Sequence, residues 1–163
     1  MELIEIKGLF CMDKGAPSPT IISNDTELFI VFYMDIDDML ALHQRNIIYD
    51  SGVVVFKFDK YIKYTFGMPG NETIQGHPYS KLGIKSYSFY ELKNSDFIKE
   101  LQNIDKIHPY YNQEKWYKYK HYILTFHDNM FECIAQGFTI NEENITLYNP
   151  ASLILNKMLA KDI

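Results

Sequence analysis

The chain has 163 residues, of which 47% are hydrophobic and 15% aromatic, and it carries a net charge of −5 at pH 7. This apolar content excludes a disordered chain, and the length fits a single domain over residues 1–163 that buries roughly 70% of its unfolded surface. The negative charge disfavours nucleic acid as a partner, although Lys115, Lys118 and Lys120 lie in a local aromatic-rich strip.

Several features favour the cytoplasm. The two cysteines, Cys11 and Cys133, lie far apart in the sequence, which suits a reducing compartment. The N-terminus is acidic where a secretory signal needs basic residues, and the longest apolar run, residues 28–34, is too short to cross a membrane. We therefore predict a cytoplasmic protein that does not bind membranes.

The first part of the chain predicts strands by three patterns. One stretch alternates between apolar and polar side chains, and another is an unbroken apolar run typical of a central strand covered on both faces. Two further apolar runs flank residues 50–52, where a glycine favours a hairpin turn. In chain order, these strands are residues 3–6, 27–33, 47–49, 53–58 and 64–66.

The middle of the chain predicts a long loop, a strand and a helix. Residues 67–83 contain four glycines and two prolines, which indicates a surface loop of functional length. A strand at residues 86–92 follows, and then Asn94 or Ser95 can cap a helix that Pro109 ends. The apolar residues of that helix recur at helical spacing and define its expected buried face. They are Phe97, Ile98, Leu101, Ile104 and Ile107.

The last part predicts a short helical turn at residues 112–117, a long hairpin at residues 120–138, a strand at residues 145–148 and a final helix. Asn149 and Pro150 are the expected N-cap and first-turn proline of that helix. Together these elements predict an α+β fold, with a mostly antiparallel sheet of five to seven strands and two main helices on one face.

The hairpin at residues 120–138 is the most informative stretch. If Asp128 and Asn129 are the central residues of a type I′ turn, one face is wholly apolar and the other is polar. That register pairs Phe126 with Phe131 and Leu124 with Cys133 on the apolar face. On the polar face it pairs Thr125 with Glu132, His127 with Met130, and His121 with Gln136.

A series of motifs between about residues 64 and 138 carries a resemblance. The motifs are Phe66-Gly, Gly76-His-Pro, Glu91-Leu-Lys-Asn-Ser, His108-Pro, and the run from Lys120 through Thr125-Phe-His-Asp to Phe131-Glu-Cys-Ile-Ala. In this order they resemble a widespread, uncharacterised family of small bacterial proteins. The resemblance implies kinship and no activity. The turn reads Asp128-Asn-Met, where the family resemblance leads us to expect small hydroxyl residues.

No complete catalytic or metal-binding motif is present. His121 and His127 lie about 20 Å apart along an extended strand, so they cannot ligate one ion. His127 and Glu132 form a closer diagonal pair on the expected hairpin, but two ligands do not make a structural zinc site. We therefore predict no catalytic residue, metal or cofactor. The candidate binding residues are His77, His108, His121, Thr125, His127, Glu132 and Glu91, with His77 and His108 brought to the polar face of the hairpin.

These features favour binding over catalysis. Acidic residues at positions 35, 37, 38, 142 and 143, together with the net charge, suit a small protein that covers a basic partner. An immunity-type antagonist of a bacterial toxin matches this profile. The alternative is an enzyme or small-molecule-binding module that uses a histidine and glutamate cluster under the loop at residues 67–83. The oligomeric state is not predicted.

Overall fold

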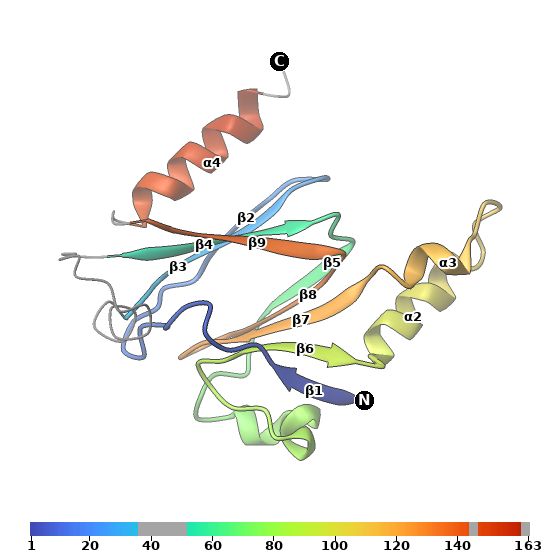
Figure 1. Ribbon diagram of the computed structural model, residues 1–163, viewed down its shortest axis with the longest axis horizontal. Coiled ribbons are helices and arrows are strands. Elements are labelled where there is room, and N and C mark those ends of the chain that lie inside the picture. The colour runs from blue at the N-terminus through green and yellow to red at the C-terminus, as the bar shows by residue number, and fades with distance from the viewer. Residues whose placement is uncertain (36–51, 144–146, 161–163) are drawn as a thin grey trace. The chain divides into compact units, whose positions relative to one another are not determined.

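The computed structural model describes residues 1–35, 52–143 and 147–160, which form two compact units (Figure 1). The first unit comprises Met1–Ile6 and Lys60–Gly137, and the second comprises Lys7–Asp59 and Phe138–Ile163. Each unit contains one antiparallel sheet.

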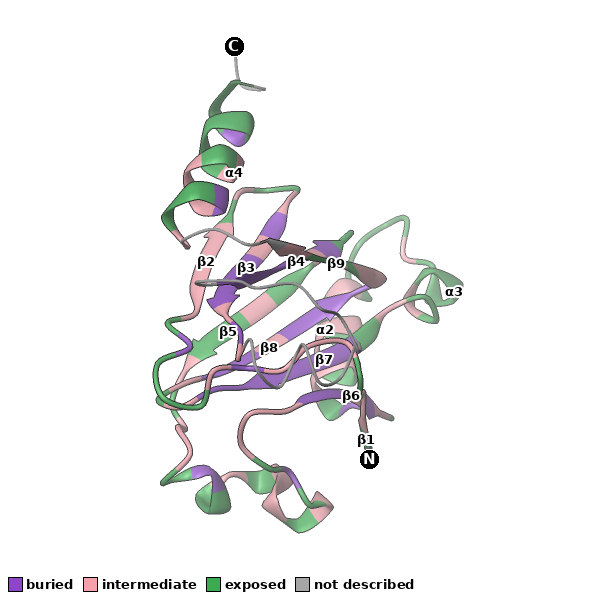
Figure 2. Cartoon of the chain, turned by 60° about the vertical axis from the view of Figure 1, so that its left-hand side comes forward, coloured by how far each residue is buried: buried purple, intermediate pink, exposed green. Residues whose placement is uncertain are grey.

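The first unit is built on a five-stranded sheet with the order β1-β6-β7-β8-β5. The long hairpin β7-β8 lies inside this sheet and is almost entirely buried, whereas β5 is an edge strand with exposed residues (Figure 2). The strands are β1 (Glu2–Glu5), β5 (Lys63–Gly67), β6 (Phe89–Lys93), β7 (Lys120–Thr125) and β8 (Met130–Ala135).

The predicted loop at residues 67–83 is ordered by two short 3-10 helices, η1 (Ile74–Gly76) and η2 (Pro78–Leu82). Ile74 is buried, and Tyr79 and Leu82 are partly buried against the same apolar cluster. That cluster includes Leu92 and Ile123 of the sheet. The loop therefore covers the sheet face that carries His121, because His121 and Ile123 are two residues apart on one strand.

Two helices lie together at one end of the five-stranded sheet, α2 (Asp96–Asp105) and α3 (Gln113–Trp116) (Figure 1). Ser95 is the N-cap of α2, and its hydroxyl accepts a hydrogen bond from the Ile98 N–H. Phe97, Ile98 and Leu101 are half-buried, whereas Ile104 and Ile107 are exposed, so the predicted buried face of α2 is covered only in part. Helical spacing shows which residues share a side of a helix, but it does not show what covers that side.

The second unit contains a four-stranded sheet with the order β2-β3-β4-β9. Its strands are β2 (Thr20–Ser23), β3 (Leu28–Tyr33), β4 (Val53–Asp59) and β9 (Gly137–Glu143), and α4 (Tyr148–Ala160) accompanies them. Val31, Val53 and Val55 form the core on one face, with Ile154 of α4 packed against them. A group of phenylalanines that includes Phe32, Phe56 and Phe138 packs together in the same unit.

The α+β class and its antiparallel character are confirmed, as is the strand, helix and hairpin order between residues 86 and 136. The strands are shared between two sheets, and each main helix accompanies a different sheet. The expected strand at residues 64–66 is part of β5, which pairs with β8. No described helix has the length and apolar character needed to cross a membrane.

Two expected features lie wholly or partly outside the described residues, and one observed strand was not expected. Residues 36–51 lie outside the described residues, and with them the expected strand at residues 47–49, Asp37 and Asp38. The strand at residues 145–148 is not found in its described part, because α4 already begins at Tyr148. The short strand β2 was missed, since its four residues follow a proline-rich segment and carry no alternation.

The turn of the β7-β8 hairpin is centred one residue earlier than predicted. The Phe126 N–H donates to the Asn129 carbonyl, so His127 and Asp128 are its central residues, and none of these four residues has a positive φ. The predicted pairing was therefore wrong by two residues: Thr125 lies opposite Met130, and His121 lies opposite Ile134. A two-residue shift leaves every side chain on its predicted face, because side chains alternate with a period of two.

Candidate functional site

His121 lies at the centre of a polar group on the loop-covered face of the first unit. Its side chain is fully buried, and its Nδ1 lies 2.7 Å from the Ser95 hydroxyl oxygen. Its Nε2 lies 2.8 Å from Glu132 Oε2, within ion-pair distance. The nitrogen is not aligned for a hydrogen bond with any acceptor in the described part of the chain. The shifted register creates this pair, because it makes His121 rather than His127 the diagonal neighbour of Glu132.

Ser95, His121 and Glu132 are the residue types of a hydrolytic triad, but their geometry does not suit catalysis. A nucleophilic serine must be reachable by a substrate carbonyl and hydrogen-bonded to the histidine base. Ser95 is only 3% exposed, and its oxygen already caps α2. The three residues therefore connect the start of α2 to the middle of the sheet.

Tyr79 and His77, both from the loop, extend this polar group towards solvent. The Tyr79 ring lies 6.2 Å from the His121 ring, and its hydroxyl is close to the Glu132 carboxylate. Burial, together with the charge and hydrogen bond of Glu132, raises the pKa of Tyr79 above its ordinary value. Burial lowers the pKa of His77, and the Glu132 charge partly offsets this effect.

His77 and His108 occupy the same local motif, His-Pro-Tyr. In each motif the histidine Nδ1 accepts the backbone N–H of the tyrosine, at 3.2 Å for His77 and 3.1 Å for His108. These bonds cap a 3-10 helix in the first case and order the turn after α2 in the second. The charge of Glu132 acts on His77, whereas His108 is exposed and its ring lies beside Tyr110.

His127 belongs to a separate group at the tip of the hairpin. Its Nδ1 lies 2.6 Å from the Tyr87 hydroxyl, and the Asn71 side-chain amide donates to the same hydroxyl. The Asn71 N–H also donates to the His127 carbonyl. Gly70 lies so close that a Cβ there would be 2.7 Å from the His127 carbonyl oxygen. His127 therefore helps to hold the loop on the hairpin, and these contacts explain why the turn is displaced.

The two remaining candidates, Thr125 and Glu91, are both held by internal bonds. The buried Thr125 hydroxyl donates to the Lys85 carbonyl at 2.7 Å and accepts from the Ser88 N–H at 3.0 Å. Glu91 lies opposite Tyr122 in the sheet, on the face away from His121, and it pairs with Lys93 and Lys120.

The sequence identified only some of the residues in this polar group. It identified His77, His121 and Glu132, but it missed Tyr79, Ser95 and Tyr87. The two His-Pro-Tyr motifs were a usable signal for Tyr79, because a turn places the third residue back over the first. Among the described residues, no three histidine, cysteine, aspartate or glutamate side chains are arranged to hold a metal ion.

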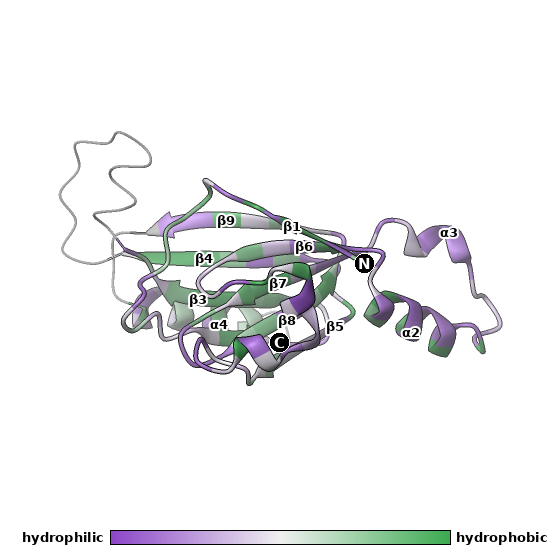
Figure 3. Cartoon of the chain, turned by 90° about the horizontal axis from the view of Figure 1, so that it is seen from below, coloured by the Kyte–Doolittle hydropathy of each residue, from purple (hydrophilic) through white to green (hydrophobic). Residues whose placement is uncertain are grey.

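An exposed apolar surface on α2 and α3 was not predicted. We define the α2–α3 groove, of about 370 Å³, by the residues that line it: Ile62, Leu101, Ile104, Asp105, Lys115, Trp116 and Tyr119. Ile104 is 59% exposed, and Ile107 just beyond α2 is 89% exposed. Figure 3 shows hydrophobic residues on one side of α2 and hydrophilic residues on the other. The Trp116 ring N–H donates to Asp105 at 2.9 Å, which fixes α3 against α2.

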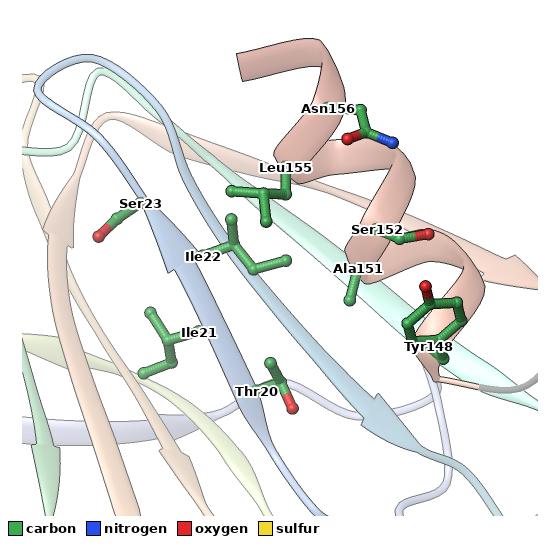
Figure 4. Close-up of a pocket in the computed structure, with 9 residues that line it drawn as sticks. All are labelled: Thr20, Ile21, Ile22, Ser23, Tyr148, Ala151, Ser152, Leu155 and Asn156. Atoms are coloured by element: carbon green, nitrogen blue, oxygen red, sulfur yellow. The ribbon is translucent and has the colours of Figure 1, made fainter. Parts of the chain in front are cut away.

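The second unit has a groove of its own between β2 and α4, of about 680 Å³ (Figure 4). Ile22 and Leu155 point towards each other across it, and Tyr148 and Ser152 lie along the helix side. The described residues that line this groove are apolar or uncharged polar.

No protein-family model, curated protein or solved structure matches this chain. The role of these surfaces therefore has to be inferred from their geometry.

Proposed function

We propose that the chain is a protein-binding domain that contacts its partner through the α2–α3 groove. The observation that carries this proposal is the amphipathic helix α2, whose apolar side is only half-buried at Phe97 and Leu101 and is exposed at Ile104. Exposed apolar side chains grouped on one surface are typical of protein interaction sites. The exposure of Ile104 and Ile107 does not stabilise the fold, because burying such a side chain would contribute about 1.5–3 kcal/mol to the free energy of folding.

The composition of this surface also supports a protein partner. Tryptophan and tyrosine are the residues that most often anchor interfaces, and Trp116 and Tyr119 line the groove beside Leu101 and Ile104. Two hydrogen bonds between side chains hold the surface in shape before any partner arrives. One joins Trp116 to Asp105, and the other joins Gln102 to Tyr111 at 3.1 Å. A preformed surface loses less conformational entropy on binding.

The finer proposal concerns the kind of partner. The net charge of −5 favours a basic protein, and an immunity-type antagonist that covers a bacterial toxin in the cytoplasm fits this profile. A second candidate function is a small-molecule site at Glu132, which is favoured by the buried His121 nitrogen that lacks an aligned hydrogen bond. We place this second below the first because the other polar groups around His121 are occupied by internal bonds.

Affinity capture with matched variants tests the proposal. The wild-type chain, Ile104→Ser and Lys99→Ser are immobilised and exposed to extract from the source cells. Lys99 is the control because it is exposed on the opposite side of α2. We expect one protein to be retained by wild type and Lys99→Ser, and its affinity to fall at least about tenfold with Ile104→Ser. Equal retention by all three chains would contradict the proposed surface.

A further inference from the structure

We infer that Glu132 and Phe97 form a receiving site for a guanidinium or ammonium group, which on the proposed function is an arginine or lysine side chain of the basic partner. The inference rests on that function for the identity of the ligand, and on the geometry of the described residues for its chemistry.

The Glu132 carboxylate is held in place but is not fully used. Its side chain is 16% exposed, and on its inner side it contacts the Tyr79 hydroxyl and His121 Nε2. A carboxylate offers about four acceptor positions, and the contact with His121 Nε2 is not aligned as a hydrogen bond, so positions remain for an incoming donor. Glu132 lies directly opposite the exposed Thr65 of the edge strand β5, and 16% of its side chain remains accessible to water.

A cation already lies on the aromatic side of this site. The Lys63 ammonium is 5.1 Å from the centre of the Phe97 ring, and the same ring lies 5.5 Å from the His121 ring. Lys63 is two residues from Thr65 on β5, so both side chains are on the Glu132 face of the sheet. Lys63 forms no ion pair in the described part of the chain. An external cation that reaches both Phe97 and Glu132 would gain a charged hydrogen bond that Lys63 does not make.

The site is continuous with the α2–α3 groove. Phe97, Leu101 and Ile104 occupy successive turns on one side of α2, and the last two line the groove. Ile62, which also lines the groove, precedes Lys63. A partner seated in the groove therefore lies next to Phe97, the aromatic part of the cation site.

The test uses two small probes of the same shape, n-butylguanidinium chloride and the neutral n-butylurea, added to the purified full-length chain. Backbone amide spectra are followed by NMR. We expect n-butylguanidinium to shift the amides of residues 63–65, 79, 97 and 132 in a saturable manner. We expect n-butylurea to bind at least about tenfold more weakly, because it lacks the charge that the carboxylate attracts.

Variants assign the effect to the named residues. Glu132→Gln should weaken guanidinium binding at least about tenfold, whereas Glu72→Gln, an exposed carboxylate in the loop, should leave it unchanged. Lys63→Gln should strengthen binding a few-fold, because it removes the competing cation. This variant keeps the test valid if Glu132→Gln fails to fold, since the Lys63 side chain is exposed and lies over the Phe97 ring without an ion pair in the described part of the chain.

The outcomes separate this inference from the proposed function. Equal binding of both probes, unchanged binding in a folded Glu132→Gln, or unchanged binding in Lys63→Gln would each overturn the cation site. Partner capture that depends on Ile104 would stand in either case, because it measures the apolar groove. Saturable guanidinium binding that Glu132→Gln removes supports the cation site even if no partner is captured.

Discussion

Two regions of the first unit differ in how their side chains are used. On the loop-covered face, His77, His121, His127 and Thr125 attract attention as potential functional groups, yet each is bound to another part of the same unit. On the α2–α3 surface the side chains are ordinary apolar residues, yet Ile104 and Ile107 remain in water. The comparison indicates that polar residues with internal partners stabilise this fold, whereas exposed apolar residues mark the surface available for binding.

The largest expected effect comes from Thr125→Val on the loop-covered face. The substitution keeps the shape of the side chain but leaves the Ser88 N–H and the Lys85 carbonyl without their hydroxyl partner in a buried place. We expect the free energy of unfolding to fall by about 2–3 kcal/mol. Urea unfolding measures it, with Thr65→Val on the exposed edge strand as the control. A loss below about 0.5 kcal/mol would show that Thr125 is not a structural residue.

A slightly smaller effect is expected from Gly70→Ala at the contact between the loop and the hairpin tip. A Cβ at this position would lie 2.7 Å from the His127 carbonyl oxygen and 2.8 Å from Asp128 Cα, and these backbone atoms cannot move aside cheaply. We expect a loss of about 1–3 kcal/mol in the free energy of unfolding. Gly76→Ala is the matched control, because no atom lies within 4 Å of its added Cβ. Equal stability of the two variants would contradict the close packing of the loop.

The pH dependence of stability provides a third test on the same face. Burial lowers the pKa of His77 in the folded protein, so the unfolded chain binds more protons near and below the ordinary histidine pKa. The contribution of His77 to stability is therefore present above about pH 6.5 and is lost as the pH falls. His77→Asn keeps a side chain that can cap η2 but cannot titrate. We expect its unfolding free energy to fall less than that of wild type between about pH 7.5 and 5.5, and equal slopes would contradict the role of His77.

The smallest effect on stability is expected on the α2–α3 surface. Ile107→Ser changes a side chain that is 89% exposed, so we expect the free energy of unfolding to change by less than about 0.5 kcal/mol. A loss above about 1.5 kcal/mol would show that Ile107 packs against the protein itself. That result would contradict the difference between the internally bonded loop-covered face and the exposed α2–α3 surface.

The sequence patterns predicted local features better than tertiary ones. Alternation assigned each side chain of the β7-β8 hairpin to its face, and the unbroken apolar run identified β3 as a central strand. The turn was displaced because Gly70 and Asn71, more than fifty residues earlier in the sequence, pack onto His127. The division of the strands between two sheets also depends on contacts between residues that are far apart in the sequence. The apolar side of α2 was visible from its spacing, but its exposure depends on what the rest of the unit covers.

The most direct test of the central claim is amide hydrogen exchange of the captured partner complex against the free chain. If the α2–α3 groove is the binding surface, exchange should slow on complex formation in residues 97–119. The loop at residues 67–83, which is already ordered by its bonds to the sheet, should change little. Slower exchange confined to residues 67–83, with residues 97–119 unchanged, would contradict the account and favour a site beneath the loop.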